Sequence, residues 1–302
     1  MLFLTALAGL ALAAEPETEI VSKPDVTYLE RDGDKLQLDL VLPKSKGPHP
    51  IVICFHGGAW MAGGRKDLTT PALFNPGGSD GKKTFAVLEN LAKNGYAAAT
   101  VSYRLAPKHK FPAQIEDAKA AVKFLRSEAK AYDLDPDRIG AMGFSAGGHL
   151  ALMLGLTTPE AGFEGTALPK VSSSVQCVVD YFGPTDMTLY KDNEAAMKSG
   201  MKPFLGKECL TDDAVLKKAS PVSYVHKKAA PTLIIHGTMD LIVPYVHSES
   251  LHKTLVKEGA KAELVPIRWK GHGWEEPAAV EKAAKATLKF LDEQLKAAGD
   301  KK

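Results

Sequence analysis

Short apolar runs alternate with segments of helical periodicity along most of the chain. Six apolar runs have the length of buried strands: residues 51–55, 96–101, 138–144, 174–182, 231–237 and 262–267. In other segments the apolar residues recur every three to four positions, which predicts helices. These are residues 85–94, 112–132, a stretch that begins after 145, 244–258 and 277–296. Strands that alternate with helices favour a mostly parallel sheet with helices on both faces.

The first part of the chain has a different pattern. Residues 26–30 and 36–42 alternate between apolar and polar positions, as paired strands do. Asp32, Gly33 and Asp34 between them supply the turn chemistry of a hairpin. With the six later runs, this hairpin gives eight strands. We therefore predict an α/β fold, with a single domain over residues 20–298 built on a mostly parallel eight-stranded sheet.

Two stretches interrupt this alternation. Residues 65–83 contain several glycines and predict a long surface loop. Residues 186–224 have mixed polarity and form an insertion between two sheet strands. Long connections of this kind often carry function, and we expect the insertion to lie over a site.

The N-terminal segment is apolar from residue 2 to 14, which is shorter than the roughly 20 residues that span a bilayer. Ala11, Leu12 and Ala13 form a small-x-small cleavage site before the polar residues 15–19. Residues 1–13 are therefore predicted to be a signal peptide, although no basic residues precede the apolar run. This predicts a periplasmic or secreted protein; the alternatives are a mis-called start and a short packed helix.

Charge and cysteine content exclude several classes of function. The 38 Lys and Arg residues nearly balance 36 Asp and Glu, for a net charge of +2, so nothing favours nucleic acid or an anionic membrane as a partner. Cys54 and Cys177 lie in apolar runs and are expected to be buried, whereas Cys209 lies in a polar segment and is expected to be exposed. No disulfide framework and no clustered metal ligands are indicated, so we expect no metal and no organic cofactor.

The sharpest motif is the sequence GFSAGG, residues 143–148, between a predicted strand and an apolar helix. In that context the glycines permit a tight turn that raises the hydroxyl of Ser145 above the sheet edge, at the N-terminus of the helix. The motif therefore predicts a nucleophile elbow. The alternative is a glycine-rich turn with an incidental serine.

A serine nucleophile requires a base that is oriented by a carboxylate, and in this type of fold the acid and then the base follow the serine along the chain. Asp240 follows the apolar run 231–237, and His272 follows the run 262–267. The carboxyl ends of parallel strands open onto one crevice. Ser145, Asp240 and His272 are therefore the predicted catalytic triad.

Other residues compete for these roles. Asp186 also follows a strand and is the main rival for the acid. His149 lies one helical turn beyond the serine, where packing beneath the elbow is favoured over a role as base. His236 ends a strand and is interpreted as structural. Glu275 and Glu276 are close to His272 in sequence but are expected at the entry to the last helix.

Acyl transfer also needs hydrogen-bond donors for the oxyanion of the tetrahedral intermediate. The sequence HGGAW, residues 56–60, follows a strand, and its glycines allow the backbone to approach a substrate. The backbone amides of Gly57 and Gly58 are expected to converge with that of Ala146, and His56 is expected to fix the loop. The alternative is a plain glycine turn.

Three aromatic residues flank these motifs and are candidates for substrate contacts. They are Trp60, Phe144 and Trp274, and each of them could wall an acyl or alcohol pocket. Ordinary core packing is an equally good interpretation for all three.

Taken together, these motifs resemble the α/β-hydrolase esterases and lipases, close to the hormone-sensitive-lipase-like and bacterial feruloyl or acetyl esterase-like groups. The resemblance runs from about residue 26 to the last helix and rests on the segments 56–60, 101–107, 111–126, 143–151, 182–187, 236–244 and 271–274. Ala59 and Phe144 differ from the hormone-sensitive-lipase pattern and favour the feruloyl or acetyl esterase-like branch.

This resemblance implies a serine carboxylic-ester hydrolase for short acyl or feruloyl esters, carried on small molecules or on carbohydrate. One alternative is a serine peptidase of the prolyl-oligopeptidase type, disfavoured because no propeller-sized domain precedes the hydrolase. The other is a non-catalytic binding member of the fold, disfavoured because every triad position is filled.

Overall fold

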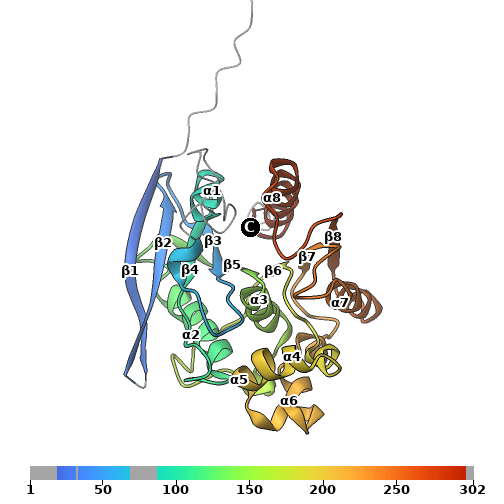
Figure 1. Ribbon diagram of the computed structural model, residues 1–302. Coiled ribbons are helices and arrows are strands. Elements are labelled where there is room, and N and C mark those ends of the chain that lie inside the picture. The colour runs from blue at the N-terminus through green and yellow to red at the C-terminus, as the bar shows by residue number, and fades with distance from the viewer. Residues whose placement is uncertain (1–18, 32, 69–86, 297–302) are drawn as a thin grey trace, which may run out of the picture.

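An eight-stranded sheet runs through the molecule (Figure 1), in a computed structural model that describes residues 19–31, 33–68 and 87–296. The predicted signal peptide, Asp32 of the hairpin turn and most of the predicted 65–83 loop lie outside these residues. The strand order is β1-β2-β4-β3-β5-β6-β7-β8. The strands are β1 (Ile20–Arg31), β2 (Asp34–Pro43), β3 (His49–Phe55), β4 (Ala97–Val101), β5 (Leu134–Phe144), β6 (Cys177–Tyr181), β7 (Thr232–Gly237) and β8 (Ala262–Ile267).

Of the eight strands that the structure describes, β2 runs in the opposite direction to the other seven. β1 pairs with β2 and β2 pairs with β4, both antiparallel, whereas every pair from β4 to β8 is parallel. The predicted hairpin and the predicted mostly parallel sheet are therefore confirmed. Because the last six strands in this order are parallel neighbours, their carboxyl ends open onto one edge.

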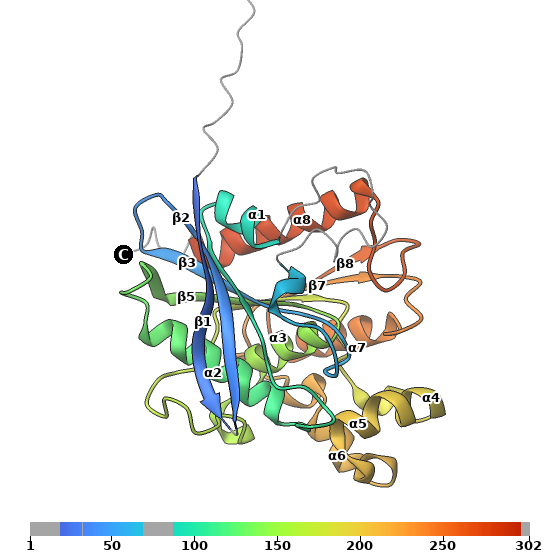
Figure 2. The same ribbon diagram turned by 60° about the vertical axis from the view of Figure 1, so that its left-hand side comes forward.

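Helices cover both faces of the sheet, and a separate apolar core lies under each set (Figures 1 and 2). On one face lie α2 (Ala113–Ser127), α3 (Ala146–Leu156) and α7 (Val246–Lys257). On the other lie α1 (Val87–Lys93) and α8 (Pro277–Leu291), which continues into a wide helical turn, η8 (Asp292–Lys296). The second helix was expected to reach residue 132 but ends at Ser127. Residues 128–133 form turns, the last at Asp133 with φ 55°, and β5 follows directly.

The insertion between β6 and β7 folds into short helical segments beside α3 (Figure 2). They are η4 (Met187–Tyr190), α4 (Glu194–Ala196), η5 (Met197–Met201), α5 (Lys202–Leu205), η6 (Lys207–Leu210), α6 (Asp213–Lys218) and η7 (Pro221–Tyr224). Cys209 lies here and is only 2% exposed, so the expectation of an exposed thiol was wrong. Its polar neighbours Lys207 and Glu208 face solvent while the thiol packs into the core.

Two buried lysines fix α2 to the segment that follows α3. The ammonium groups of Lys119 and Lys123 each lie 2.8 Å from a carboxylate oxygen of Glu164. The hydroxyl of Ser173 donates to the same carboxylate at 2.9 Å. Burial by itself would raise the pKa of Glu164, but these donors outweigh it and lower the pKa to about 2. Glu164 therefore stays ionised and compensates two charges that are hidden from water.

Candidate active site

Three side chains from the turns after β5, β7 and β8 form one hydrogen-bonded chain. His272 Nε2 lies 2.9 Å from Ser145 Oγ, and His272 Nδ1 lies 2.7 Å from Asp240 Oδ2. Since a carboxylate only accepts, the ring hydrogen belongs on Nδ1, which leaves Nε2 free to accept from the serine hydroxyl. The structure thus brings together the three residues that the motifs selected, although 127 residues separate Ser145 from His272.

Ser145 sits on a strained turn between β5 and α3. Its backbone has φ 55° and ψ −118°, which is rare for a residue with a side chain and is typical of a nucleophile elbow. Glycine is required on both sides of it. A Cβ on Gly143 would lie 2.1 Å from the carbonyl oxygen of Gly147, and one on Gly147 would lie 2.1 Å from that of Phe55. The close approach of β3, β5 and α3 therefore depends on these glycines.

The carboxylate of Asp240 accepts hydrogen bonds on both oxygens. Oδ1 accepts from the backbone N–H groups of Ile242 at 2.8 Å and Val243 at 2.9 Å. Oδ2 accepts from His272 and also from His236 Nε2 at 3.1 Å. Burial by itself would raise the pKa of Asp240, but the bonds from the two histidines and the charge of His272 hold it well below its usual range. The carboxylate therefore stays ionised when it orients His272.

The loop after β3 lies directly beside the serine. A Cβ on Gly57 would be 3.5 Å from the Cβ of Ser145. Gly58 has φ 107°, and a Cβ on it would lie 2.1 Å from the carbonyl oxygen of Ala62, so no side chain fits there. In the part of the chain that the structure describes, no acceptor is bonded to the backbone N–H of Gly57, Gly58 or Ala146. The arrangement leaves these donors available to an oxyanion.

His56 and Tyr103 hold this loop in place. The two rings stack with centroids 4.3 Å apart, and the Tyr103 hydroxyl donates to the carbonyl of His56 at 2.9 Å. His56 Nδ1 lies 2.7 Å from the carbonyl oxygen of Gly57, and burial lowers the pKa of this histidine. The contacts agree with the expected role of His56. The contribution of Tyr103 was missed, because it comes from the loop after β4.

The rival residues lie elsewhere. Asp186 accepts from the backbone and hydroxyl of Thr188 at 2.9 and 2.6 Å and caps η4. His149 accepts from Trp60 Nε1 at 3.2 Å and lies 2.8 Å from Ala219 O, and burial lowers its pKa to about 4. Glu276 pairs with Lys270. None of these bonds reaches His272, so the geometry favours Asp240 as the acid.

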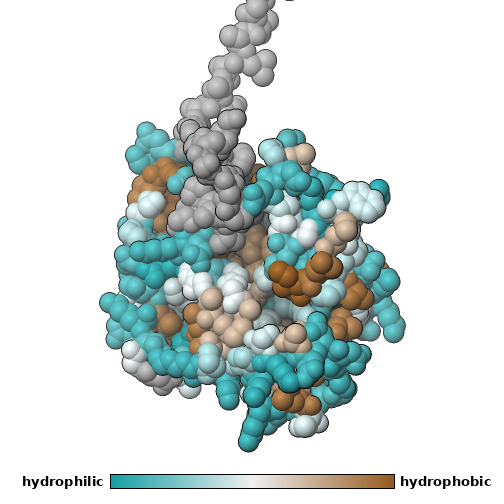
Figure 3. Space-filling model, in the orientation of Figure 1, coloured by the Kyte–Doolittle hydropathy of each residue, from teal (hydrophilic) through white to brown (hydrophobic). Residues whose placement is uncertain are grey.

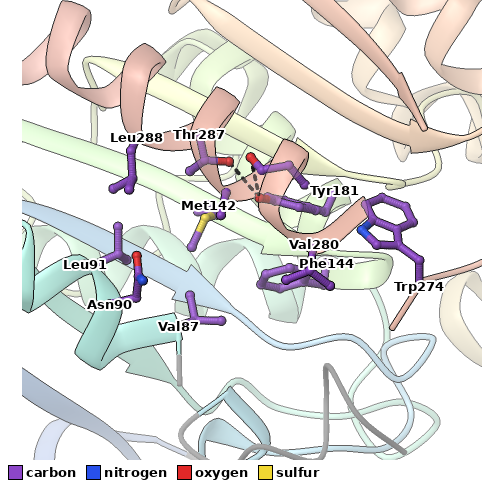
Figure 4. A pocket seen from close by; sticks show the side chains of 12 residues that line it. Val87, Asn90, Leu91, Met142, Phe144, Tyr181, Trp274, Val280, Thr287 and Leu288 are labelled. Carbon is purple, nitrogen blue, oxygen red and sulfur yellow. Dashed lines mark hydrogen bonds between the residues drawn. The ribbon is translucent and has the colours of Figure 1, made fainter. Parts of the chain in front are cut away.

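The three aromatic candidates do not share one pocket. Trp60 is buried on the α2 and α3 face, where its ring stacks on Phe204 with centroids 4.0 Å apart. Phe144 and Trp274 lie on the opposite face and line an apolar pocket between α1 and α8 (Figure 4). No triad residue lines this pocket. Phe182, which was not selected, contacts the candidate triad instead, since its ring packs edge-on against His272 with centroids 4.8 Å apart.

An exposed apolar rim lies beside Asp240 and His272. Leu241 is 93% exposed and Trp269 is 78% exposed, and Met239 and Ile242 are also exposed. The turns that carry them are bonded to each other, with Met239 N donating to Lys270 O at 2.8 Å and Trp269 N to Thr238 Oγ1 at 3.0 Å. Apolar residues, in brown, are visible near β7 and β8 in Figure 3.

The backbone of Trp269 is also unusual. Its φ of 62° is a genuine outlier for a bulky side chain. Backbone strain of this kind is found preferentially at functional sites. An exposed indole held in this way, three residues before His272, is a candidate contact for substrate.

Within 19–31, 33–68 and 87–296, no three His, Cys, Asp or Glu side chains are grouped as they would be to hold a metal ion. No helix in that part of the chain has both the length and the apolar character needed to cross a bilayer.

Comparison with known proteins gives consistent matches. The family model BD-FAE matches residues 38–255. Esterase LipC of Mycobacterium tuberculosis is 29% identical over 234 residues, which are 76% of this chain and 54% of LipC. The chain spans about half the length of the curated relatives it matches, with 54%, 47% and 43% of the first three covered.

Two solved structures match most of this chain. A truncated form of a carbohydrate esterase from gut microbiota superposes with a TM-score of 0.72 and 29% identity, covering 94% of this chain and 99% of that one. A bifunctional GH43-CE protein of Bacteroides eggerthii gives a TM-score of 0.75 with 28% identity, over 90% of this chain and 38% of that protein.

Proposed function

Because the chain belongs to the BD-FAE family of α/β-hydrolase esterases, we propose that it is a serine carboxylic-ester hydrolase that uses Ser145, His272 and Asp240. The observation that carries the proposal is the continuous hydrogen-bonded chain from Ser145 Oγ to Asp240 Oδ2. A serine hydroxyl near neutral pH is a weak nucleophile, and this chain supplies the base and the carboxylate that orients it.

In the acylation step, Ser145 Oγ attacks the ester carbonyl carbon while His272 Nε2 takes the hydroxyl proton. Asp240 holds the proton on His272 Nδ1 and stabilises the imidazolium that forms. The backbone N–H groups of Gly57, Gly58 and Ala146 donate to the oxyanion. When the tetrahedral intermediate collapses, the imidazolium returns its proton to the alkoxide, and the alcohol leaves.

In the deacylation step, water attacks the acyl group on Ser145 and gives its proton to His272. Collapse of the second tetrahedral intermediate releases the carboxylic acid and restores the serine hydroxyl. Both steps use the same base and the same oxyanion donors. Loss of the base or of one donor therefore slows acylation and deacylation alike. Every proton that moves in this scheme is held by this chain, by the substrate or by water.

The proposed substrates are short acyl esters, acetyl above all, or feruloyl esters carried on carbohydrate. Two similar structures are described as a carbohydrate esterase and a GH43-CE protein. The exposed indole of Trp269 supplies a flat apolar face on which the C–H groups of a sugar ring can pack. A periplasmic or secreted location, as the predicted signal peptide implies, fits a polymeric carbohydrate substrate.

A panel of substrates tests this function. Hydrolysis of p-nitrophenyl acetate, butyrate and octanoate should be fastest for the shortest chain, and acetylated xylo-oligosaccharides and methyl ferulate identify the natural class. A dipeptide p-nitroanilide is the control for peptidase activity. Amide cleavage as fast as ester cleavage would favour the peptidase alternative, and no turnover of any ester would favour a binding protein.

A further inference from the structure

His236 shares the Asp240 carboxylate with the predicted base. Its Nε2 lies 3.1 Å from Asp240 Oδ2, the same oxygen that accepts from His272 at 2.7 Å. Sequence position suggested only a structural role at the end of β7. The structure instead places this imidazole in direct contact with the catalytic carboxylate, fully buried from solvent.

The neighbours of His236 determine which ring nitrogen carries hydrogen. Nε2 faces two acceptors, Asp240 Oδ2 and the carbonyl oxygen of Val243 at 2.9 Å, so the hydrogen belongs on Nε2. Nδ1 lies 2.6 Å from the hydroxyl oxygen of Ser248 on α7, and that hydroxyl can donate to it. Ser248 therefore favours the tautomer in which His236 donates to the carboxylate.

Among the residues that the structure describes, few ionisable groups surround His236 and Asp240. The ring of His236 packs edge-on against Tyr245 and Phe182, with centroids 5.6 and 6.3 Å away. His247 of α7 is the neighbouring histidine, and burial lowers its pKa to about 4, so it is neutral near pH 7. Beyond it are the ring of Tyr190, with its centroid 4.9 Å from that of His247, and the carboxylate of Asp186. Asp240 and His272 are therefore the charged partners that respond when His236 changes.

We propose that His236 is a positioning residue that fixes the Asp240 carboxylate and, by donating to Oδ2, limits how strongly that carboxylate attracts a proton onto His272. This inference rests on the proposed triad. Without the second donor, Oδ2 carries more negative charge towards His272 and stabilises its protonated form. Because only neutral His272 can accept the serine proton, activity should then be lost at a higher pH than in the wild type.

Paired substitutions separate this role from simple packing. His236→Gln places an amide donor near the Nε2 position, within reach of Asp240, whereas His236→Asn reaches only the Nδ1 position. His236→Phe fills the space with no donor. His49→Phe is the matched control, since His49 is a buried histidine at the start of β3, bonded to Ser45 O at 2.9 Å and at the opposite end of a parallel strand from the site.

The readout is kcat and KM for p-nitrophenyl acetate from pH 5 to 9, with melting temperature measured in parallel. We expect kcat of the Asn and Phe variants to fall about 10- to 100-fold, as happens when partners behind metal-bound histidines are removed, with KM changed less than about twofold. The acidic limb of their kcat/KM profiles should shift to higher pH by about half a pH unit or more. His236→Gln should recover most of kcat and the wild-type limb, and His49→Phe should lower only the melting temperature.

Other outcomes overturn the inference. If His236→Asn keeps the wild-type kcat and acidic limb, or if the Gln and Asn variants are impaired equally with no movement of the limb, His236 is structural. If the Phe variant does not fold, the Gln and Asn pair still decides. Ser145→Ala, measured in the same series, tests the triad separately: full activity in that variant would refute the proposed function itself, whatever the His236 variants show.

Discussion

Replacing Asp240 by asparagine tests the proposed triad through the tautomer of His272. The carboxylate accepts from two backbone amides on Oδ1 and from two imidazoles on Oδ2. Asparagine has a single acceptor oxygen, and turning its NH₂ group towards the backbone amides would place donors against donors. The NH₂ group must therefore face His272 Nδ1, which forces the ring hydrogen onto Nε2.

With hydrogen on Nε2, His272 cannot accept the proton of Ser145. The equivalent substitution in a Ser-His-Asp triad lowers kcat by about 10⁴-fold, which corresponds to about 5.5 kcal/mol of transition-state stabilisation. We expect Asp240→Asn to lose kcat by about 10³- to 10⁴-fold at pH 7. Initial rates with p-nitrophenyl acetate, corrected for spontaneous hydrolysis, measure this loss.

Asp186→Asn is the matched control for this experiment. Asp186 also follows a sheet strand, but its carboxylate bonds Thr188. An asparagine oxygen can still accept from the Thr188 amide, so kcat should stay within about twofold of the wild type. The reasoning is refuted if Asp240→Asn keeps more than about a tenth of the wild-type kcat, or if Asp186→Asn loses as much as Asp240→Asn.

Three further predictions concern stability, the elbow and substrate binding. The pKa of Glu164 in the folded protein, about 2, lies below its ordinary value, so the stabilisation it provides, at most about 3 kcal/mol, is present above about pH 4.5 and is lost towards pH 2. Glu164→Gln should therefore lower the unfolding free energy at pH 7, because Lys119 stays buried without its counter-charge. The substitution should also flatten the acid dependence of the unfolding free energy in urea titrations. Gly147→Ala should abolish ester hydrolysis or prevent folding, since the new Cβ would meet Phe55 O at 2.1 Å; activity and circular dichroism together check this. Trp269→Ala should raise KM about tenfold for acetylated xylo-oligosaccharides and leave p-nitrophenyl acetate kinetics unchanged.

Each of these predictions has an outcome that contradicts it. Unchanged stability of Glu164→Gln at pH 7 would mean that the desolvation cost of the Glu164 carboxylate cancels its ion pairs. A fully active Gly147→Ala would show that the strand and helix can separate at no cost. Equal effects of Trp269→Ala on both substrate classes would argue that this indole supports the His272 turn rather than binding sugar.

The fold could be predicted from the sequence because strands that alternate with helices can form only a few sheet topologies. Residues 26–30 and 36–42 indicated the hairpin, and the later apolar runs indicated the parallel part of the sheet. The placement of Ser145, Asp240 and His272 was also predictable, because residues that follow parallel strands collect at one edge. Their catalytic roles are what the substitutions above test.

Contacts that depend on side-chain direction could not be predicted in this way. The spacing of His236 and Asp240 does not show that the ring turns towards the carboxylate, since that depends on Ser248 from α7. Cys209 was expected at the surface because local polarity does not reveal which side of a short helical turn packs inward. Trp60 and Phe144 were grouped together, although the sheet separates them.

The most direct measurement is covalent labelling of the proposed nucleophile. The protein is treated with phenylmethylsulfonyl fluoride, and the residual activity, the intact mass and the modified peptide are determined, with Ser145→Ala as the control. We predict one sulfonyl group per chain, located on Ser145, with activity lost in proportion to labelling and with neither labelling nor activity in the Ser145→Ala variant. Inactivation with the label on another residue, or an active Ser145→Ala variant, would contradict the account.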